Sequence, residues 1–252
     1  MPIHFARRLT GHRRSADANR HLGFALAFIA GAINAGGFLA VQQYTSHMTG
    51  IVSGMADHVA LGSYGPVLAG LGAILSFLMG AACTGLMVSY ARQYRLHSEY
   101  ALPLLLEALL LLGFGLLGLR LAAVKGLFVP ATVMLLCFIM GLQNAVITKL
   151  SKAEIRTTHL TGTITDIGIE LGKLVFCSVT RADTGRVTVN RARLRIHATL
   201  VGCFFLGGVS GALGFKHLGY LSTLPLALLL SALAIVPMVD DLLRLRRRLA
   251  RK

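Results

Sequence analysis

The stretch Pro66–Ala91, PVLAGLGAILSFLMGAACTGLMVSYA, contains no Asp, Glu, Lys or Arg. An apolar run of about 20 residues is long enough to cross the hydrocarbon core of a bilayer as a helix. Further long apolar runs with few charges lie at Leu22–Val41, Tyr100–Ala122, Phe128–Leu150, Leu194–Phe215 and Tyr220–Met238. The sequence therefore predicts an all-α, polytopic transmembrane helix bundle.

The composition agrees with a membrane protein. Of the 252 residues, 55% are hydrophobic and only 14% are charged, and the mean hydropathy is +0.69. A soluble domain carries about 25% charged residues. The four cysteines lack CxxC spacing, and the chain has no P-loop, GxSxG, HExxH or dinucleotide-binding motif. We therefore expect no enzymatic activity, no cofactor and no metal site.

The net charge of +15 is concentrated outside the apolar runs. Basic residues gather in the N-terminal arm 1–21, in the loop 178–194 and in the C-terminal tail 239–252. Lys and Arg beside membrane segments mark the cytoplasmic side and attract anionic lipid headgroups. We expect cytoplasmic termini, with the bilayer and its anionic headgroups as partners, and no nucleic acid. The sequence leaves a homo-oligomer open.

Two short motifs occur twice in the same order. Thr45-Ser-His-Met-Thr-Gly50 is matched 112 positions later by Thr157-Thr-His-Leu-Thr-Gly162. Upstream, Gly31-Ala-Ile-Asn-Ala35 is matched 110 positions later by Gly141-Leu-Gln-Asn-Ala145. These matches predict two internal membrane repeats, 22–122 and 128–238. Internal repeats with interrupted polar segments are typical of transporters, where those segments form the binding site.

The less apolar segments Ser46–Gly62 and Thr157–Cys177 leave two topologies open. If both cross the membrane, the chain has eight crossings. If both are re-entrant or discontinuous, it has six crossings and the repeats are inverted. The bias of basic residues toward the cytoplasm favours six, because it then places five basic residues inside: Arg92, Arg95, Lys149, Lys152 and Arg156.

The repeated motif supplies the predicted binding residues. Ser46 and Thr158 are good N-cap residues, and a helix N-terminus with free N–H groups can hold an anion or a polar solute. Two such ends facing each other would form one polar site near the midplane. The alternative is that the hydroxyls only cap helices and the histidines bond nearby carbonyls. The predicted substrate-binding residues are Asn34, Ser46, His47, Thr49, Asn144, Thr158, His159 and Thr161.

Carboxylates inside apolar segments are the second functional signal. Glu107 lies within a leucine-rich run, where a charge costs at least about 2.5–3.5 kcal/mol at the helix centre. Asp166 and Glu170 share one helical face with Lys173. We assign proton coupling to Glu107, Asp166 and Glu170 as a hypothesis. The alternatives are a neutral Glu107 bonded to a neighbouring helix and a simple Glu170–Lys173 ion pair.

Small residues predict where helices approach each other. Gly80-Ala-Ala-Cys-Thr-Gly85 and Gly207-Gly-Val-Ser-Gly211 both lie inside apolar runs. Small residues at these positions let membrane helices pack closely.

The chain resembles the YoaK family of bacterial inner-membrane proteins, a domain of unknown function. The resemblance covers about residues 20–240 and is densest at 46–55, 99–107 and 156–172. It implies a multi-pass inner-membrane protein without an established substrate. The residues themselves favour a small-molecule secondary transporter or permease. A channel, or a membrane scaffold or sensor that transports nothing, remains the alternative.

Overall fold

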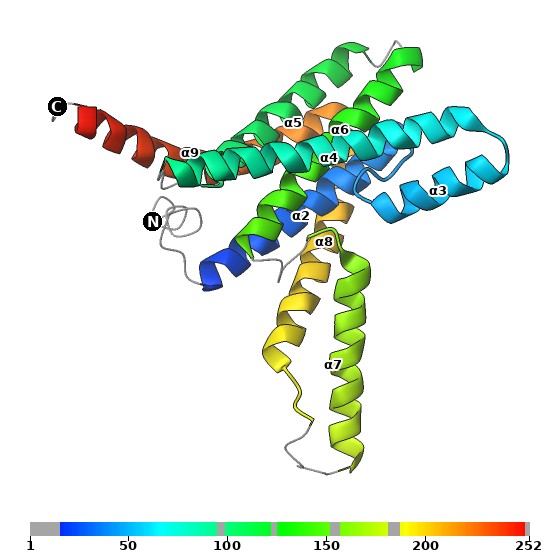
Figure 1. The fold of residues 1–252 in the computed structure, drawn as a ribbon, viewed down its shortest axis with the longest axis vertical. Coiled ribbons are helices and arrows are strands. Elements are labelled where there is room, and N and C mark those ends of the chain that lie inside the picture. Colours follow the sequence, from blue (N-terminus) through cyan, green and yellow to red (C-terminus); the bar gives the residue numbers. More distant parts are fainter. Residues whose placement is uncertain (1–15, 95–98, 122–124, 152–156, 181–186, 250–252) are drawn as a thin grey trace.

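The computed structural model describes residues 16–94, 99–121, 125–151, 157–180 and 187–249 (Figure 1). In chain order its elements are α2 (Ala16–Val41), α3 (Met48–Ala60), α4 (Tyr64–Gln93), α5 (Ala101–Leu121), α6 (Lys125–Leu150), α7 (Leu160–Thr180), α8 (Arg191–Leu218), the 3-10 helix η1 (Gly219–Ser222) and α9 (Thr223–Leu249). The predicted apolar runs coincide with the long helices apart from end residues, and α9 continues eleven residues beyond the predicted end of its run at Met238. The prediction of an all-helical fold is confirmed.

Several helices have the length and composition of membrane spans. Within the described residues, four stretches are apolar enough to cross a bilayer: Asn19–Val41, Tyr64–Gln93, Pro130–Leu150 and Arg191–Ile235. The last of these includes α8, η1 and the start of α9, and the chain turns between them at Gly219, where φ is +59°. A shorter apolar helix, Ala101–Leu116, lies in α5. The chain is a membrane-like helical protein.

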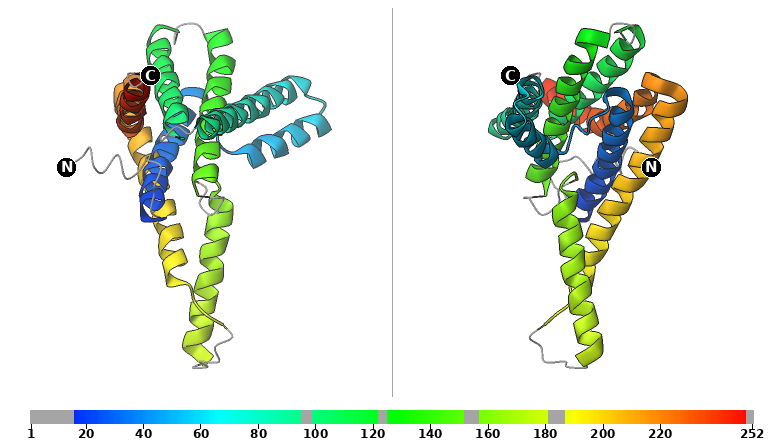
Figure 2. Two further views of the ribbon diagram at one scale, coloured as in Figure 1. Left: turned by 60° about the vertical axis from the view of Figure 1, so that its left-hand side comes forward. Right: turned by 90° about the vertical axis from the view of Figure 1, so that its right-hand side faces the viewer.

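The long helices pack in pairs that are distant in sequence. α2 lies along α8, α4 along α6, and α5 along α9. The shorter helices pack on their successors, α3 on α4 and α7 on α8. Two helical hairpins result, α3–α4 and α7–α8, and they project from the rest of the molecule in different directions (Figures 1 and 2). The hydrophobic core lies between α2, α5, α6 and α9.

Glycines allow the closest helix crossings. A Cβ atom placed on Gly80 of α4 would lie 2.9 Å from the Phe138 carbonyl carbon and 3.0 Å from the Leu142 amide nitrogen, both in α6. The contact is reciprocal, because a Cβ on Gly141 of α6 would lie 2.9 Å from the Phe77 carbonyl carbon of α4. Both helices therefore bring a Phe-x-x-Gly sequence to the same crossing.

The α2–α8 crossing has the same construction. A Cβ on Gly31 would lie 2.9 Å from the Phe204 carbonyl carbon, and one on Gly207 would lie 2.7 Å from the Phe28 carbonyl carbon. The glycine-rich contact faces predicted in α4 and α8 are confirmed at Gly80 and Gly207. Gly85 is different, because a Cβ there would meet no atom within 4 Å.

α2 and α6 run antiparallel. The Asn19 side-chain amide donates to the Leu150 carbonyl at 3.5 Å, and the Gln143 side-chain amide donates to the Leu26 carbonyl at 3.2 Å. Moving seven residues forward along α2 therefore corresponds to moving seven residues back along α6. This orientation fixes where the two polar motifs lie relative to each other.

Candidate functional site

The chain folds back on α2 immediately after that helix ends. Gln42, the residue after Val41, has φ +55°, in the left-handed region. The returning chain places Ser46 beside Asn34, whose Oδ1 accepts from the Ser46 amide at 3.3 Å and from the Ser46 hydroxyl at 2.9 Å. Asn34 precedes the end of α2 by seven residues, which is about 10 Å of helix. α3 therefore starts part-way along α2 and not at its end.

The second motif makes the corresponding contact with α6. The Thr158 hydroxyl donates to Asn144 Oδ1, and the Asn144 amide donates to the Met140 carbonyl at 2.8 Å. α6 continues to Leu150, so Thr158 also returns to a point part-way along the preceding helix. Two of the predicted pairs, Asn34 with Ser46 and Asn144 with Thr158, are thus brought together in the same way.

The prediction that Ser46 caps α3 is wrong. The N-cap of α3 is His47, which makes no side-chain capping bond, and the Ser46 hydroxyl is used by Asn34. α7 begins at Leu160, two residues after Thr158, whose hydroxyl is likewise used by Asn144. In each motif the hydroxyl therefore bonds to the asparagine of the preceding long helix and not to a backbone N–H group in the first turn of the following helix.

Each histidine lies over the first turn of its own helix. A Cβ on Gly50 would lie 2.6 Å from His47 Nδ1, and a Cβ on Gly162 would lie 2.7 Å from His159 Nδ1. The glycine that ends each motif therefore leaves room for the imidazole ring. Both histidines are exposed, as are Thr49 and Thr161 one position before each glycine.

The first residue of each motif is buried and lacks a partner. Thr45 is 0% exposed and Thr157 is 1% exposed, and neither hydroxyl has a hydrogen-bond partner among the described residues. A buried polar group without a partner costs about 1–3 kcal/mol. Thr45 and Thr157 were not among the predicted binding residues, although their repetition in the motif was a usable signal.

The two copies lie at different levels of the antiparallel α2–α6 pair. Gln143, the neighbour of Asn144, bonds to Leu26, and Asn34 lies eight residues beyond Leu26. Eight helical residues correspond to about 12 Å. The structure therefore forms two polar clusters, one around Asn34 and one around Asn144, separated along the helix axis.

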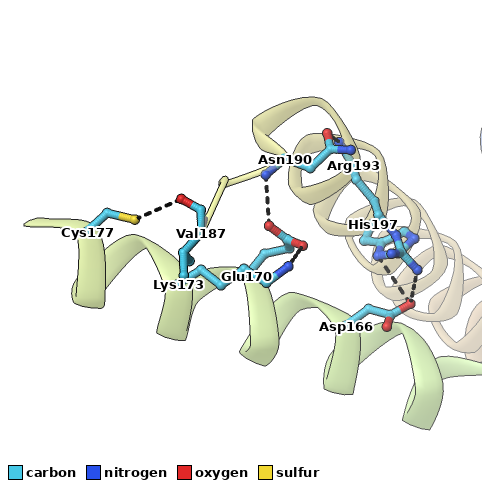
Figure 3. Close-up of polar contacts among 8 residues, drawn as sticks. All are labelled: Asp166, Glu170, Lys173, Cys177, Val187, Asn190, Arg193 and His197. Atoms are coloured by element: carbon cyan, nitrogen blue, oxygen red, sulfur yellow. Dashed lines mark hydrogen bonds and ion pairs between the residues drawn. The ribbon is translucent and has the colours of Figure 1, made fainter. Parts of the chain in front are cut away.

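Asp166 and Glu170 lie in the α7–α8 hairpin and are both paired (Figure 3). Asp166 Oδ2 accepts from Arg193 Nη2 at 3.1 Å and lies 3.8 Å from His197 Nδ1. Glu170 binds Lys173 Nζ at 2.8 Å, which confirms the predicted Glu170–Lys173 ion pair.

Glu170 also holds the start of α8. Its second carboxylate oxygen accepts from the Asn190 backbone amide at 2.9 Å. α7 lies outside the four stretches that are long and apolar enough to span a membrane. The hydrogen bond from Lys173, together with that from the Asn190 amide, lowers the pKa of Glu170 below its ordinary value. A charged Glu170 therefore fastens α7 to α8.

Glu107 has a different environment. It is 0% exposed, and neither carboxyl oxygen has a hydrogen-bond partner among the described residues. Its neighbours in α5, Leu104 and Ala108, belong to the hydrophobic core. The three predicted proton-coupling acids are therefore not equivalent, because only Glu107 is unpaired.

A family model described as "Protein of unknown function (DUF1275)" matches residues 22–236. The chain belongs to the DUF1275 family. Its DUF1275 region contains both hairpins and every predicted site residue from Asn34 to Glu170. No curated protein and no solved structure matches the chain.

The geometry gives this DUF1275 protein two similar polar clusters. Each combines an asparagine of a long helix, a hydroxyl bonded to it, a buried unpaired threonine hydroxyl and the open N-terminus of a shorter helix. Backbone N–H groups at a helix start and free hydroxyls are suitable partners for an anionic or hydroxyl-bearing group. Such clusters can bind a small polar solute without covalent chemistry.

Proposed function

We propose that this protein is a secondary transporter or permease for a small polar solute, and not an enzyme. The observation that carries the proposal is the pair of helix starts at α3 and α7. Each lies part-way along a long apolar helix, beside a threonine hydroxyl that is buried and unpaired. Discontinuous helices whose N-termini point at a polar group are typical of transporter binding sites.

The length of α3 and the composition of α7 favour six crossings. α7 has 21 residues, enough for a span by length alone, but it lies outside the four stretches that are apolar enough to cross a bilayer. α3 has 13 residues and is about 20 Å long, whereas a bilayer core is about 30 Å thick. We propose that α3 and α7 enter the membrane without crossing it as separate spans. The antiparallel α2 and α6, each followed by its folded-back motif, support two inverted repeats, 22–122 and 128–238.

The basic residues support a bacterial inner-membrane protein with cytoplasmic termini, in line with its resemblance to the YoaK family. We propose that the arm 1–21 and the tail 239–252 contact anionic lipid headgroups. The proposal includes no nucleic-acid partner and leaves room for a homo-oligomer.

We assign solute binding to the two clusters. In this assignment Asn34 and Asn144 hold the hydroxyls of Ser46 and Thr158 in place. His47, Thr49, His159 and Thr161 line the exposed first turns. The separation of about 12 Å along the axis favours two stations that a solute occupies in turn. A single site contacted by both histidines requires the clusters to approach each other.

Ligand binding followed by flux tests the proposal. Purified protein is screened for solutes that raise its thermal midpoint, because a ligand of the native state stabilises it. Each hit is then tested for saturable uptake and counterflow in liposomes. The variants His47→Ala and His159→Ala should weaken binding, whereas His217→Ala, at an exposed position near the end of α8, should not.

The double variant distinguishes the two arrangements. If His47 and His159 contact one solute together, the double change should cost less than the sum of the single changes, because residues that share a partner couple. Two separate stations predict additive losses. The absence of stabilising solutes and of counterflow would contradict transport and favour a scaffold or sensor. Flux without saturation would favour a channel.

A further inference from the structure

Glu107 is the one predicted proton-coupling acid that the described structure leaves without a partner. Asp166 and Glu170 lie in the α7–α8 hairpin and bind Arg193 and Lys173. Glu107 is fully buried, and neither of its oxygens has a hydrogen-bond partner among the residues that the structure describes. A charge without a counter-ion is strongly disfavoured at such a position. The acid must therefore hold a proton in this conformation.

The packing of α5 places Glu107 in the middle of a helix pair. Near the end of α5, a Cβ on Gly115 would lie 3.2 Å from the Tyr220 carbonyl oxygen, immediately before α9. α9 then runs back along α5, and its residues Ala227 and Leu230 are buried in the same core as Ala108. Glu107 therefore lies between leucines and alanines, away from both ends of the pair.

Among the described side chains, the groups around α5 supply no charge for Glu107. From α4, Arg92 binds Glu99 at 2.9 Å and the Tyr100 hydroxyl at 3.2 Å, beside the start of α5. From α6, Lys149 is exposed, near the end of that helix. From η1, Tyr220 packs on Phe114.

Further ionisable groups lie on these elements, and the side chains of Arg120 in α5 and Lys125 in α6 are outside the described residues. Cys137 of α6 belongs to a separate cluster with Ile51 and Ala73. The acidic residues of α9 begin at Asp240, beyond the described side chains. No charged partner of Glu107 is therefore found among the described side chains.

A buried acid without a partner is not a stabilising feature of the described fold. α5 and α9 begin alike, with Leu102-Pro-Leu104 and Leu224-Pro-Leu226. Counted from these sequences, the position of Glu107 in α5 corresponds to Leu229 in α9, which is exposed whereas Glu107 is buried. An apolar residue in place of a buried ionisable one is commonly neutral or stabilising. An acid that stabilises nothing in the resting fold is best explained by use in another conformation.

We propose that Glu107 is a proton-binding site in the membrane core, which takes its proton from water and returns it during the transport cycle. The proposal rests on the proposed transport function and adds the proton as the coupling ion. In each exchange the carboxylate gains one proton from a hydronium ion, leaving water, and the reverse step restores the carboxylate.

Infrared spectroscopy of the whole protein in lipid nanodiscs at neutral pH tests this directly. The difference between wild type and Glu107→Gln should contain the C=O stretching band of a protonated carboxyl group. On transfer to heavy water the band should shift, because the proton is replaced by deuterium. A band that never shifts would show a permanently sealed, structural acid and would overturn the proposal. The absence of the band would show an ionised Glu107 and would also overturn it.

Carbodiimide labelling tests the same claim in wild type, so it does not depend on the folding of a variant. The carboxyl O–H adds across a C=N bond of the carbodiimide, the acid proton moves to nitrogen, and acyl migration leaves a stable N-acylurea. An apolar carbodiimide should label Glu107 at neutral pH, and labelling should fall when the reaction is carried out at alkaline pH, where the carboxyl group loses its proton. The ion-paired Asp166 and Glu170 are the internal controls and should remain unlabelled. Labelling of those two acids in place of Glu107 would overturn the proposal.

These outcomes are separable from the transport assay. If Glu107 exchanges its proton and is labelled but the protein shows no flux, the proton-binding site is supported and the transport function is contradicted. If the protein shows flux but Glu107 is not labelled and its proton does not exchange, the transport function is supported and the proton-binding site is contradicted.

Discussion

Replacing Gly80 by Ala tests the close crossing of α4 and α6. The new Cβ would lie 2.9 Å from the Phe138 carbonyl carbon, whereas carbon atoms in good contact are about 3.5–4.0 Å apart. The two helices would have to separate by about 1 Å, because the obstructing atoms belong to backbone that cannot rotate away. Overpacking of this kind costs about 1–3 kcal/mol.

The same helix contains a matched control. Gly85 lies five residues further along α4, and a Cβ there would meet no atom within 4 Å. Gly→Ala at an unobstructed helical position stabilises by about 0.5–1 kcal/mol. We therefore expect Gly80→Ala to lower stability by about 1–2 kcal/mol net, which is several degrees of thermal midpoint at about 2–4 °C per kcal/mol. Gly85→Ala should raise the midpoint slightly.

Thermal unfolding of the purified variants in one detergent measures both effects. α8 offers a second matched pair, since Gly207 meets the backbone of Phe28 whereas Gly202 meets nothing within 4 Å. Combining Gly80→Ala with Gly141→Ala should cost less than the sum, because both open one crossing. Gly80→Ala with Gly207→Ala should be additive. Equal midpoints for Gly80→Ala and Gly85→Ala would refute this packing.

Three further predictions concern the site, the hairpin and the topology. Asn34→Leu should lower stability by about 1 kcal/mol through loss of the Ser46 hydrogen bonds, whereas Asn34→Asp retains an acceptor oxygen and should cost less; equal losses would contradict the contact in the thermal assay. The lowered pKa of Glu170 means that its charged form stabilises the fold above pH 4.5, its ordinary value, and that this stabilisation is lost as pH falls through the lower folded pKa. The thermal midpoint of wild type should therefore drop more steeply on acidification than that of Glu170→Gln, and parallel curves would contradict the pairing. In a cysteine-free background, Ser63→Cys should react with an impermeant thiol reagent from outside the cell, whereas Thr188→Cys should not; an unreactive Ser63→Cys would favour eight crossings.

The sequence predicted the position of most helices because hydropathy is a local property. The run Pro66–Ala91 could only be stable in lipid as a helix, since every backbone polar group must then be satisfied internally. Local spacing also predicted the glycine contacts at Gly80 and Gly207 and the ion pair between Glu170 and Lys173. Each depends on residues three to five positions apart in one helix.

The sequence misassigned the hydroxyl of Ser46 because two acceptable partners compete for it. Local preference favours capping of α3, but the fold-back at Gln42 brings Ser46 to Asn34, twelve residues earlier in the chain. Neither the left-handed conformation of Gln42 nor the burial of Thr45 can be read from the motif. Both depend on how the returning chain packs against α2.

The apolar runs, the repeated motif and the presence of an acid, Glu107, within a leucine-rich run were determined by the sequence alone, because each follows from the identity and local spacing of residues. The pairing of α2 with α8 and of α4 with α6 was decided only in the tertiary structure. Any two apolar helices can adjoin in lipid, where no hydrophobic force selects the partner. The choice depends on shape, and the fit of Phe28 and Gly31 to Phe204 and Gly207 exists only once helices distant in the sequence are brought together.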